Sequence, residues 1–222
     1  MKKLTSLTIA APLLLAASIA QAEVSANFGA TSNYLWRGVT QSADGASVSG
    51  GLDYSNESGF YAGTWIGTID WGIGNAAETD LYLGYSGEAD GFSYDVGYVY
   101  YAYLESEYDG SDFGELYFKG AMADFNFSIA YTINSDADDA APFGQGDLYY
   151  SVGYEFALSE DYSLALTVGH YDFDVDGALD ADYSHAQLDL SKGDFTFSVS
   201  KTTDSALSDD DLKLVVSWST SF

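Results

Sequence analysis

The feature that most constrains the fold of this chain is the alternation of side chains in its last eleven residues, 212–222. Every second residue is apolar, aromatic or threonine: Leu214, Val216, Trp218, Thr220 and Phe222. Between them lie Lys213, Val215, Ser217, Ser219 and Ser221. A period of two places successive side chains on opposite faces of a β-strand. The segment is therefore predicted to be a strand with one largely apolar face and one mostly polar face.

Similar patterns divide the chain after residue 22 into about twelve strand-like segments. They span residues 24–37, 46–54, 60–69, 79–86, 92–104, 114–121, 125–133, 147–157, 162–171, 182–191, 195–202 and 212–222. Most of them contain about 8 to 13 residues, and a tilted strand needs about 9 to 11 residues to cross a bilayer. The lengths are therefore compatible with strands that span a membrane.

The connections between these segments alternate in length. Short turns are predicted at residues 56–59, 87–91, 122–124, 158–161 and 192–194, and longer loops at 38–45, 70–78, 105–113, 134–146, 172–181 and 203–211. Short turns on one side and long loops on the other are the layout of an outer-membrane barrel. A closed barrel also pairs its last strand with its first, so that no strand edge faces lipid. The sequence therefore predicts an all-β fold, a closed antiparallel transmembrane β-barrel of about twelve strands.

A soluble fold is the alternative that this pattern leaves open. In a secreted β-sandwich or a lipocalin-like barrel, the apolar faces would point inward. The aromatic content of 16%, with 19 Tyr against 13 Phe and 4 Trp, favours the membrane barrel, because tyrosine suits the boundary between apolar and wet surroundings. The mean hydropathy of −0.06 does not argue against it, since lipid-facing and lumen-facing residues cancel in the average.

Residues 1–22 have the pattern of a secretory signal peptide. Lys2 and Lys3 are followed by an apolar run over residues 8–20, and Ala20-Gln21-Ala22 is an A-x-A cleavage site. Cleavage would leave the barrel as residues 23–222, with 5 basic and 34 acidic residues and a net charge of −29. The protein is therefore expected to reach the cell outer membrane by export through the signal peptide.

The net charge of the whole chain is −27. Such acidity disfavours nucleic acid as a partner, because nucleic acid binds to basic surfaces. The predicted partners are outer-membrane lipid and lipopolysaccharide on the outside, and small hydrophilic solutes or cations on the inside. Cysteine is absent, which excludes disulfides and thiolate metal sites. The sequence leaves the oligomeric state open.

The N-terminal half resembles a known family in several short motifs. These are Ser32-Asn33-Tyr34-Leu35-Trp36-Arg37-Gly38, Gly51-Leu52-Asp53-Tyr54, Ser58-Gly59-Phe60-Tyr61-Ala62-Gly63 and Asp80-Leu81-Tyr82-Leu83-Gly84-Tyr85-Ser86-Gly87. They are similar to the TorF family, a bacterial outer-membrane family that carries the provisional label of porins and is also catalogued as one of unknown function. The resemblance covers about residues 24–103 and implies an outer-membrane barrel. It implies no particular substrate and no catalytic residues.

If the apolar faces meet lipid, the opposite faces line the lumen. The candidate pore-lining residues are Arg37, Asp95, Glu115, Lys119, Glu155, His185, Asp189 and Lys213, with Asn27, Asn33, Asp53, Asp80 and Gln187 as further inward groups. Arg37 is predicted near the long-loop end of the first strand and Lys213 at the same end of the last strand, so that the two cations would be neighbours. Acidic residues opposite them would create a transverse field that sets ion selectivity. Inward tyrosines at positions 82, 101, 103, 117 and 149 would instead fill and plug the lumen.

Neither a metal site nor a catalytic site is predicted. Asp172, Asp174 and Asp176, followed by Gly177, match the opening of an EF-hand loop, but the twelfth position is Tyr183 rather than a glutamate. They therefore remain weak candidates for metal binding. A barrel hydrolase would need a nucleophile beside a base, and no nucleophile motif accompanies His170, expected at a polar rim, or His185, expected in the lumen. No cofactor is expected.

These observations predict a passive channel for small hydrophilic solutes or ions. The acidic loops, such as residues 136–139 and 209–211, should attract cations and repel anions, which predicts a weak cation preference. The alternative is a non-conducting barrel with a structural or surface-binding role through the same loops.

Overall fold

The computed structural model describes residues 23–138, 140–159 and 161–222, so the predicted signal peptide, residues 1–22, lies outside the described residues. The strands of the barrel are β1 (Glu23–Thr31), β4 (Ser47–Ser55), β5 (Phe60–Asp70), β6 (Asn75–Ala89), β7 (Phe92–Tyr103), β8 (Phe113–Met122), β9 (Phe125–Ser135), β10 (Leu148–Ala157), β11 (Tyr162–Asp172), β12 (Tyr183–Lys192), β13 (Phe195–Thr202) and β14 (Lys213–Ser221). The remaining elements are the short strands β2 (Leu35–Trp36) and β3 (Val39–Thr40), the 3-10 turn η1 (Ser106–Tyr108) and the helix α1 (Asp176–Leu179).

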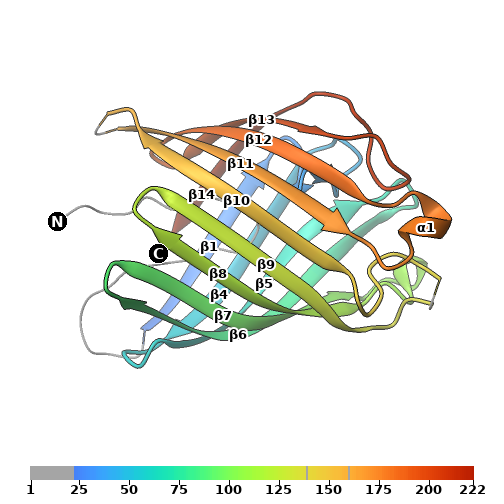
Figure 1. Cartoon of the computed structure of the whole chain (residues 1–222), viewed down its shortest axis with the longest axis horizontal. Helices are drawn as coiled ribbons and strands as arrows, with labels where there is room; N and C mark the ends of the chain where they lie inside the picture. Colours follow the sequence, from blue (N-terminus) through green and yellow to red (C-terminus); the bar gives the residue numbers. More distant parts are fainter. Residues whose placement is uncertain (1–22, 139, 160) are drawn as a thin grey trace.

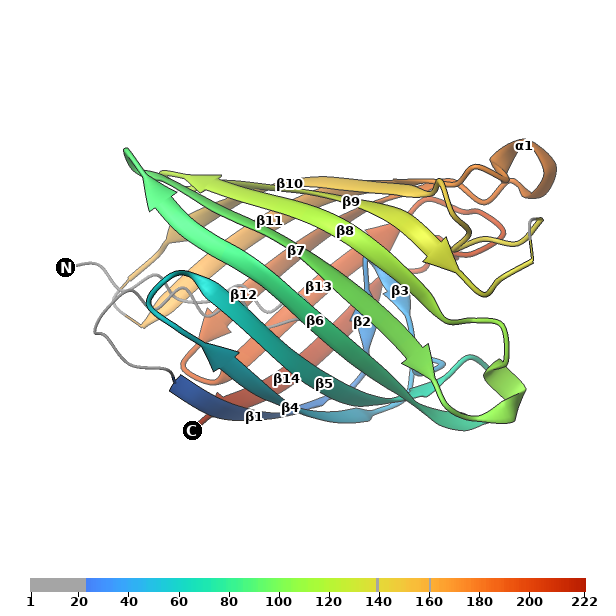
Figure 2. The same cartoon turned by 90° about the horizontal axis from the view of Figure 1, so that it is seen from below.

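Twelve strands form one closed barrel within the described part of the chain (Figures 1 and 2). Each strand pairs antiparallel with its neighbours in sequence, and β1 pairs with β14 from Asn27 opposite Ser221 to Thr31 opposite Ser217. Two further backbone hydrogen bonds join Ala26 and Phe222, at 2.9 and 3.0 Å. The predicted fold and the pairing of the last strand with the first are therefore confirmed.

The strand boundaries follow the predicted segments closely, with two exceptions. The first strand ends at Thr31 and not at Arg37, because residues 32–46 leave the barrel wall. Strands β5 and β6 continue pairing as far as Asp70 opposite Asn75. The connection between them is therefore residues 71–74 and not the long loop predicted at 70–78.

The outside of the barrel is apolar. Large apolar side chains exposed on its wall include Val48, Leu52, Ile66, Leu81, Leu83, Val96, Leu116, Phe127, Val152, Leu166, Val168, Phe197, Leu214 and Val216. Soluble proteins rarely expose a contiguous apolar patch of more than a few hundred Å², whereas a transmembrane barrel needs an apolar band around its outside. This distribution excludes the soluble sandwich and the lipocalin-like barrel, in which these faces would be buried. No helix of the described residues is long and apolar enough to cross a membrane.

The two ends of the barrel differ. The C-terminus and the start of β1 lie at the end with the short turns, and α1 lies at the opposite end with the long loops (Figure 1). Buried aromatic residues fill the interior toward the long loops, among them Trp36, Tyr101, Phe113, Tyr149, Tyr171 and Phe173. The interior toward the short turns is lined instead by hydrogen-bonded polar side chains.

Candidate functional site

The first long loop folds back into the barrel as a small hairpin, which we call the inner hairpin (residues 32–46). Leu35 pairs with Thr40 and Trp36 with Val39, around a two-residue turn at Arg37 and Gly38. Both turn residues have positive φ, 51° and 88°, as a type I′ hairpin turn requires. A Cβ atom at position 38 would lie 2.6 Å from Cβ of His185. The tip of the inner hairpin therefore packs tightly against the barrel wall at β12.

Arg37 at this tip is enclosed by the barrel wall. Its Nη1 and Nη2 donate to Oε1 and Oε2 of Glu115 on β8 at 2.7 and 2.6 Å, and the two side chains are only 8% and 1% exposed. Two parallel hydrogen bonds of this kind are the strongest contact between a guanidinium and a carboxylate. Although burial opposes the charge, Glu115 raises the pKa of Arg37 above its ordinary value, so the guanidinium stays protonated.

Aromatic rings complete the surroundings of Arg37. Its Cζ lies 4.2 Å from the ring centroids of Trp36 and Tyr149 and 4.9 Å from that of Tyr171. The hydroxyl groups of Tyr101 and Tyr171 donate to Glu115 at 3.3 and 3.2 Å. The interaction of a cation with the face of an aromatic ring contributes about 0.5 to 2 kcal/mol of favourable free energy. We call Tyr101, Glu115, Tyr149 and Tyr171, which all belong to the barrel wall, the arginine cage.

A second buried carboxylate holds the start of the inner hairpin. The hydroxyl of Tyr34 donates to Oε1 of Glu78 at 2.7 Å, and that of Tyr103 donates to Oε2 at 3.0 Å. Burial and the neighbouring Glu78 raise the pKa of Tyr34 well above its ordinary value, so its hydroxyl remains a donor. Asp80 is buried nearby on the same strand, and its Oδ1 has no hydrogen-bond partner among the described residues.

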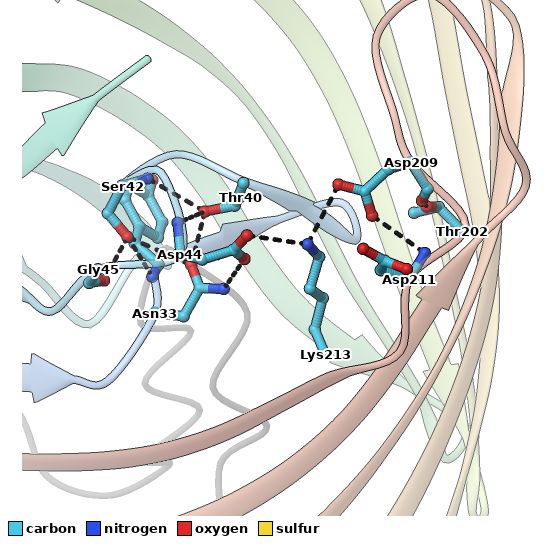
Figure 3. A network of polar contacts seen from close by, with 10 residues as sticks. Asn33, Thr40, Ser42, Asp44, Gly45, Thr202, Asp209, Asp211 and Lys213 are labelled. Carbon is cyan, nitrogen blue, oxygen red and sulfur yellow. Dashed lines mark hydrogen bonds and ion pairs between the residues drawn. The ribbon is translucent and has the colours of Figure 1, made fainter. Parts of the chain in front are cut away.

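The base of the inner hairpin is tied to the barrel wall near the rim (Figure 3). Nζ of Lys213 lies 3.0 Å from Oδ2 of Asp44 and 3.1 Å from Oδ2 of Asp209. Nδ2 of Asn33 donates to Oδ1 of Asp44 at 2.7 Å. Both aspartates are half exposed, so each ion pair contributes at most about 1 kcal/mol. On the other side, indole Nε1 of Trp71 donates to Oε1 of Gln41 at 2.9 Å.

The interior near the short turns is polar and less crowded by aromatic rings. Nδ2 of Asn27 donates to Asp53 at 3.1 Å, and the hydroxyl of Tyr82 also donates to Asp53. Farther around the wall, the hydroxyl of Tyr61 donates to Asp95 at 2.5 Å. The amide of Gln187 donates to Asp189 at 3.0 and 3.1 Å, and Nζ of Lys119 lies 4.6 Å from the Tyr117 ring centroid.

All the candidate pore-lining residues point into the barrel or lie at its rim, but the predicted arrangement of cations is not found. Arg37 belongs to the inner hairpin, so its prediction as part of the first barrel strand is wrong. It pairs with Glu115, whereas Lys213 pairs with Asp44 and Asp209. Because Arg37 touches Glu115 directly, the two do not face each other across an open constriction.

The other interior candidates take separate positions. His185 is buried, and its Nε2 lies 2.9 Å from the hydroxyl of Tyr149. Asp95 and Lys119 are paired positions on β7 and β8, and Glu155 lies half buried on β10 near a short turn. The predicted inward tyrosines at 101, 103, 117 and 149 are buried, and that at 82 is half buried.

The aspartates of the EF-hand-like segment have structural contacts. Oδ1 of Asp176 accepts the backbone N–H of Asp182 at 2.9 Å, and the backbone N–H of Asp174 donates to Asp147. Asp172 is the last residue of β11. In the described residues, no group of three or more His, Cys, Asp or Glu side chains is arranged to hold a metal ion.

His170 lies on the outward face of β11, close to the long-loop end. Its Nδ1 is 2.9 Å from Oγ of Ser184 on the adjacent strand. Among the described residues, no carboxylate is hydrogen-bonded to this imidazole or to that of His185, and the two rings contact Ser184 and Tyr149 respectively.

The inner hairpin is the part of the site that the sequence analysis missed. Leu35-Trp36 and Val39-Thr40 flank Arg37-Gly38, and a residue-Gly pair between two short β-prone runs indicates a tight hairpin. Glu78, Tyr171 and Phe143 were also missed, and Phe143 stacks on Phe113 with ring centroids 5.4 Å apart. It is the one large apolar residue in the acidic loop between β9 and β10, which is the signal that would have singled it out.

Comparison with known proteins supports the fold and identifies a family. The model of a family described as "Bacterial protein of unknown function (Gcw_chp)" matches residues 16–208. It does not carry the name TorF, so that name stays a prediction. No curated protein matches the chain.

Solved structures share the architecture at low sequence identity. The KdgM porin is 10% identical with a TM-score of 0.56, over 89% of this chain and 98% of that one. The same porin in complex with disordered oligogalacturonate is 9% identical with a TM-score of 0.51, over 89% and 95% of the two chains. An outer membrane channel from Pseudomonas putida F1 is 11% identical with a TM-score of 0.54, over 96% and 99%. At these identities the similarity shows the fold alone.

Proposed function

We propose that this chain, which belongs to the Gcw_chp family of bacterial proteins of unknown function, is a passive channel of the bacterial outer membrane for small hydrophilic solutes and cations. The observation that carries the proposal is the distribution of side chains in a closed barrel. The wall is apolar on the outside and rich in hydrogen-bonded carboxylates on the inside. A lumen that only had to fill a structural barrel would not need this many charged groups, because each buried charge costs free energy.

The predicted export of the chain is consistent with a function in the outer membrane. The signal peptide of residues 1–22 would direct the chain across the inner membrane and leave residues 23–222 as the barrel. The barrel would then contact outer-membrane lipid through its apolar wall, and lipopolysaccharide at the end with the long loops.

The interior charge supports a preference for cations. Among the described residues, the inward-facing or rim carboxylates include Asp44, Asp53, Glu78, Asp80, Asp95, Glu115, Glu155, Asp189 and Asp209, and the inward-facing or rim cations include Arg37, Lys119 and Lys213. Carboxylates that line a pore favour cations and repel anions. A polyanion such as oligogalacturonate, which is named in one KdgM structure, would be repelled here. We therefore propose cations or neutral hydrophilic solutes as cargo.

The inner hairpin limits the width of the path. It occupies the interior near the long loops, where Trp36 packs against Tyr101, Phe113 and Tyr171 with ring centroids 5.7 to 6.2 Å apart. This packing supports a narrow path rather than a wide one. The same packing favours the alternative function, a non-conducting barrel that binds or stabilises through its long acidic loops.

Planar-bilayer recordings of the refolded mature protein test the proposal. We expect discrete conductance steps, and a reversal potential in a potassium chloride gradient that favours potassium over chloride. A reversal potential favouring chloride would overturn the cation preference. A correctly folded barrel that never conducts in salts of differing ion size would support the non-conducting alternative instead.

A further inference from the structure

The arginine cage is a more complete cation site than an ion pair alone. Glu115 accepts from the guanidinium with both oxygens, at 2.7 and 2.6 Å, and Cζ of Arg37 lies over the rings of Tyr149 and Tyr171, 4.2 and 4.9 Å from their centroids. The carboxylate is itself oriented by the hydroxyl groups of Tyr101 and Tyr171. A planar fork of donors and flat apolar faces are the two features that distinguish guanidinium from ammonium. The cage therefore has the shape and charge of a guanidinium site.

The cage and its occupant belong to separate parts of the structure. The four cage residues lie on β7, β8, β10 and β11, whose pairing does not involve the inner hairpin. Arg37 is carried by the inner hairpin, which is tied to the wall by the partly exposed Lys213 ion pairs, by the Trp71–Gln41 hydrogen bond and by the buried Tyr34–Glu78 hydrogen bond. The four cage residues would therefore stay in place if the tip of the inner hairpin moved away.

Removal of Arg37 alone is energetically costly, since it would leave Glu115 charged and buried without a partner. Breaking a buried pair in this way is strongly destabilising, because it leaves an uncompensated buried charge. A free cation with the same fork of donors would offset that cost by taking the place of Arg37. Arg37 and a free cation therefore compete for the carboxylate of Glu115, and binding of the cation favours release of the inner hairpin.

We propose that the arginine cage is a binding site for guanidinium-bearing cations in the lumen, and that Arg37 occupies it as a tethered competitor that narrows the path. The proposal rests on the channel function proposed above and names a substrate class for it. Because a short tether gives an effective concentration in the millimolar range, a free ligand must reach about that concentration to displace Arg37.

Binding of methylguanidinium to purified, detergent-solubilised protein tests the site without relying on conductance. Methylurea is the neutral control of similar shape, and the readout is saturation-transfer NMR of the ligand methyl group. The variants are Arg37→Ala, which empties the cage, the same variant with Glu115→Gln, and the same variant with Asp95→Asn as a matched lumen carboxylate outside the cage. Resistance of each barrel to SDS until heating verifies that it is folded.

We expect Arg37→Ala to bind methylguanidinium at least about tenfold more tightly than the wild type, because the tethered competitor is gone. The added Glu115→Gln change should weaken this binding at least about tenfold, as expected for a lost bidentate pair. The added Asp95→Asn change should retain it, and methylurea should not bind. Equal binding by the wild type and Arg37→Ala, or by Arg37→Ala with and without Glu115→Gln, would overturn the proposal.

Bilayer recordings of the same variants separate this inference from the channel function. If Arg37→Ala conducts and methylguanidinium neither blocks the current nor binds, the channel stands and the cage proposal fails. If Arg37→Ala binds methylguanidinium through Glu115 but no variant conducts, the site stands and the channel function fails.

Discussion

At the residue scale, the interior of this protein is organised by tyrosine hydroxyls that donate to buried carboxylates. Tyr34 and Tyr103 share Glu78, while Tyr101 and Tyr171 share Glu115. A carboxylate that loses a donor in a buried position keeps its desolvation cost without compensation. The phenols therefore allow acidic groups to remain in a barrel interior that is also filled with aromatic rings.

Replacement of Tyr34 by Phe tests this role. The change removes the 2.7 Å hydrogen bond to Glu78 and leaves the ring in place. We expect the free energy of unfolding in urea, measured in lipid vesicles, to fall by about 1 to 3 kcal/mol. The matched control is Tyr98→Phe, which removes an exposed hydrogen bond to Asn134 of 2.9 Å. It should change the stability by less than about 0.5 kcal/mol, and an equal effect of the two variants would contradict the argument.

The inward direction of the candidate side chains was predictable at this scale because it follows from parity. In a strand of known register, every second residue faces inward, which placed Asp95, Glu115 and His185 correctly. Their partners were not predictable, since Arg37 and Glu115 are separated by 78 positions and meet only when the inner hairpin folds inward. The TorF name and the roles of these side chains in a channel stay predictions.

At the element scale, the inner hairpin is a long loop that lies inside the barrel, as loops that plug other outer-membrane barrels do. Its ends are close together, because Thr31 of β1 pairs directly with Ser47 of β4. The barrel strands therefore pair without any contribution from the residues between them. The inner hairpin is an insertion into a complete barrel and not a part of its closure.

Excision of the inner hairpin tests whether it restricts the path. We expect replacement of residues 33–45 by a short Gly-Ser linker to leave a folded barrel, since the strands on either side are already paired. The single-channel conductance should rise several-fold, because the buried rings of Tyr34 and Trp36 would be replaced by water. The control replaces α1, which contains no buried residue, by a linker of the same kind. A conductance that is the same in both variants would argue against a restricting role.

The short connection between β5 and β6 also shows what local patterns miss. Residues 70–78 contain two glycines, a tryptophan and few alternating side chains, and so they resemble a loop. In the barrel, the pairing of β5 with β6 continues into this segment, as far as Asp70 opposite Asn75. Residues 75–78 are extended because they pair with β5, although their own sequence does not favour a strand.

At the scale of the whole molecule, the apolar wall and the uneven ends determine how the barrel sits in a membrane. The long loops, with α1 among them, lie at one end, and the short turns lie at the other (Figure 2). In bacterial outer-membrane barrels, the short turns face the periplasm and the long loops face the outside of the cell. We therefore expect the same orientation here.

The absence of cysteine from the sequence allows a direct test of this orientation. Ala178→Cys places a thiol on α1, and Glu57→Cys places one in a short turn, both at exposed positions. A membrane-impermeant maleimide should label Ala178→Cys in intact cells and Glu57→Cys only after the outer membrane is permeabilised. The reverse pattern would show the opposite orientation, and labelling of neither protein in permeabilised cells would contradict the exposure of these sites.

The sequence by itself determined the barrel. Alternation with a period of two, segment lengths that match a bilayer and connections of alternating length are local properties, and each remains visible without any long-range contact. They gave the strand number, the closure of β1 on β14 and the side chains that face inward.

Only the tertiary structure decided how the interior is filled. Whether residues 32–46 lie outside the wall or inside it depends on the free energy of burying Trp36 and Arg37 against Glu115, Tyr149 and Tyr171, which belong to strands far along the chain. The free energy of this burial depends on contacts with residues far away in the sequence, so a local sequence pattern does not reveal it. The sequence therefore specified the wall of the barrel, and the packing of distant side chains specified the occupant of its lumen.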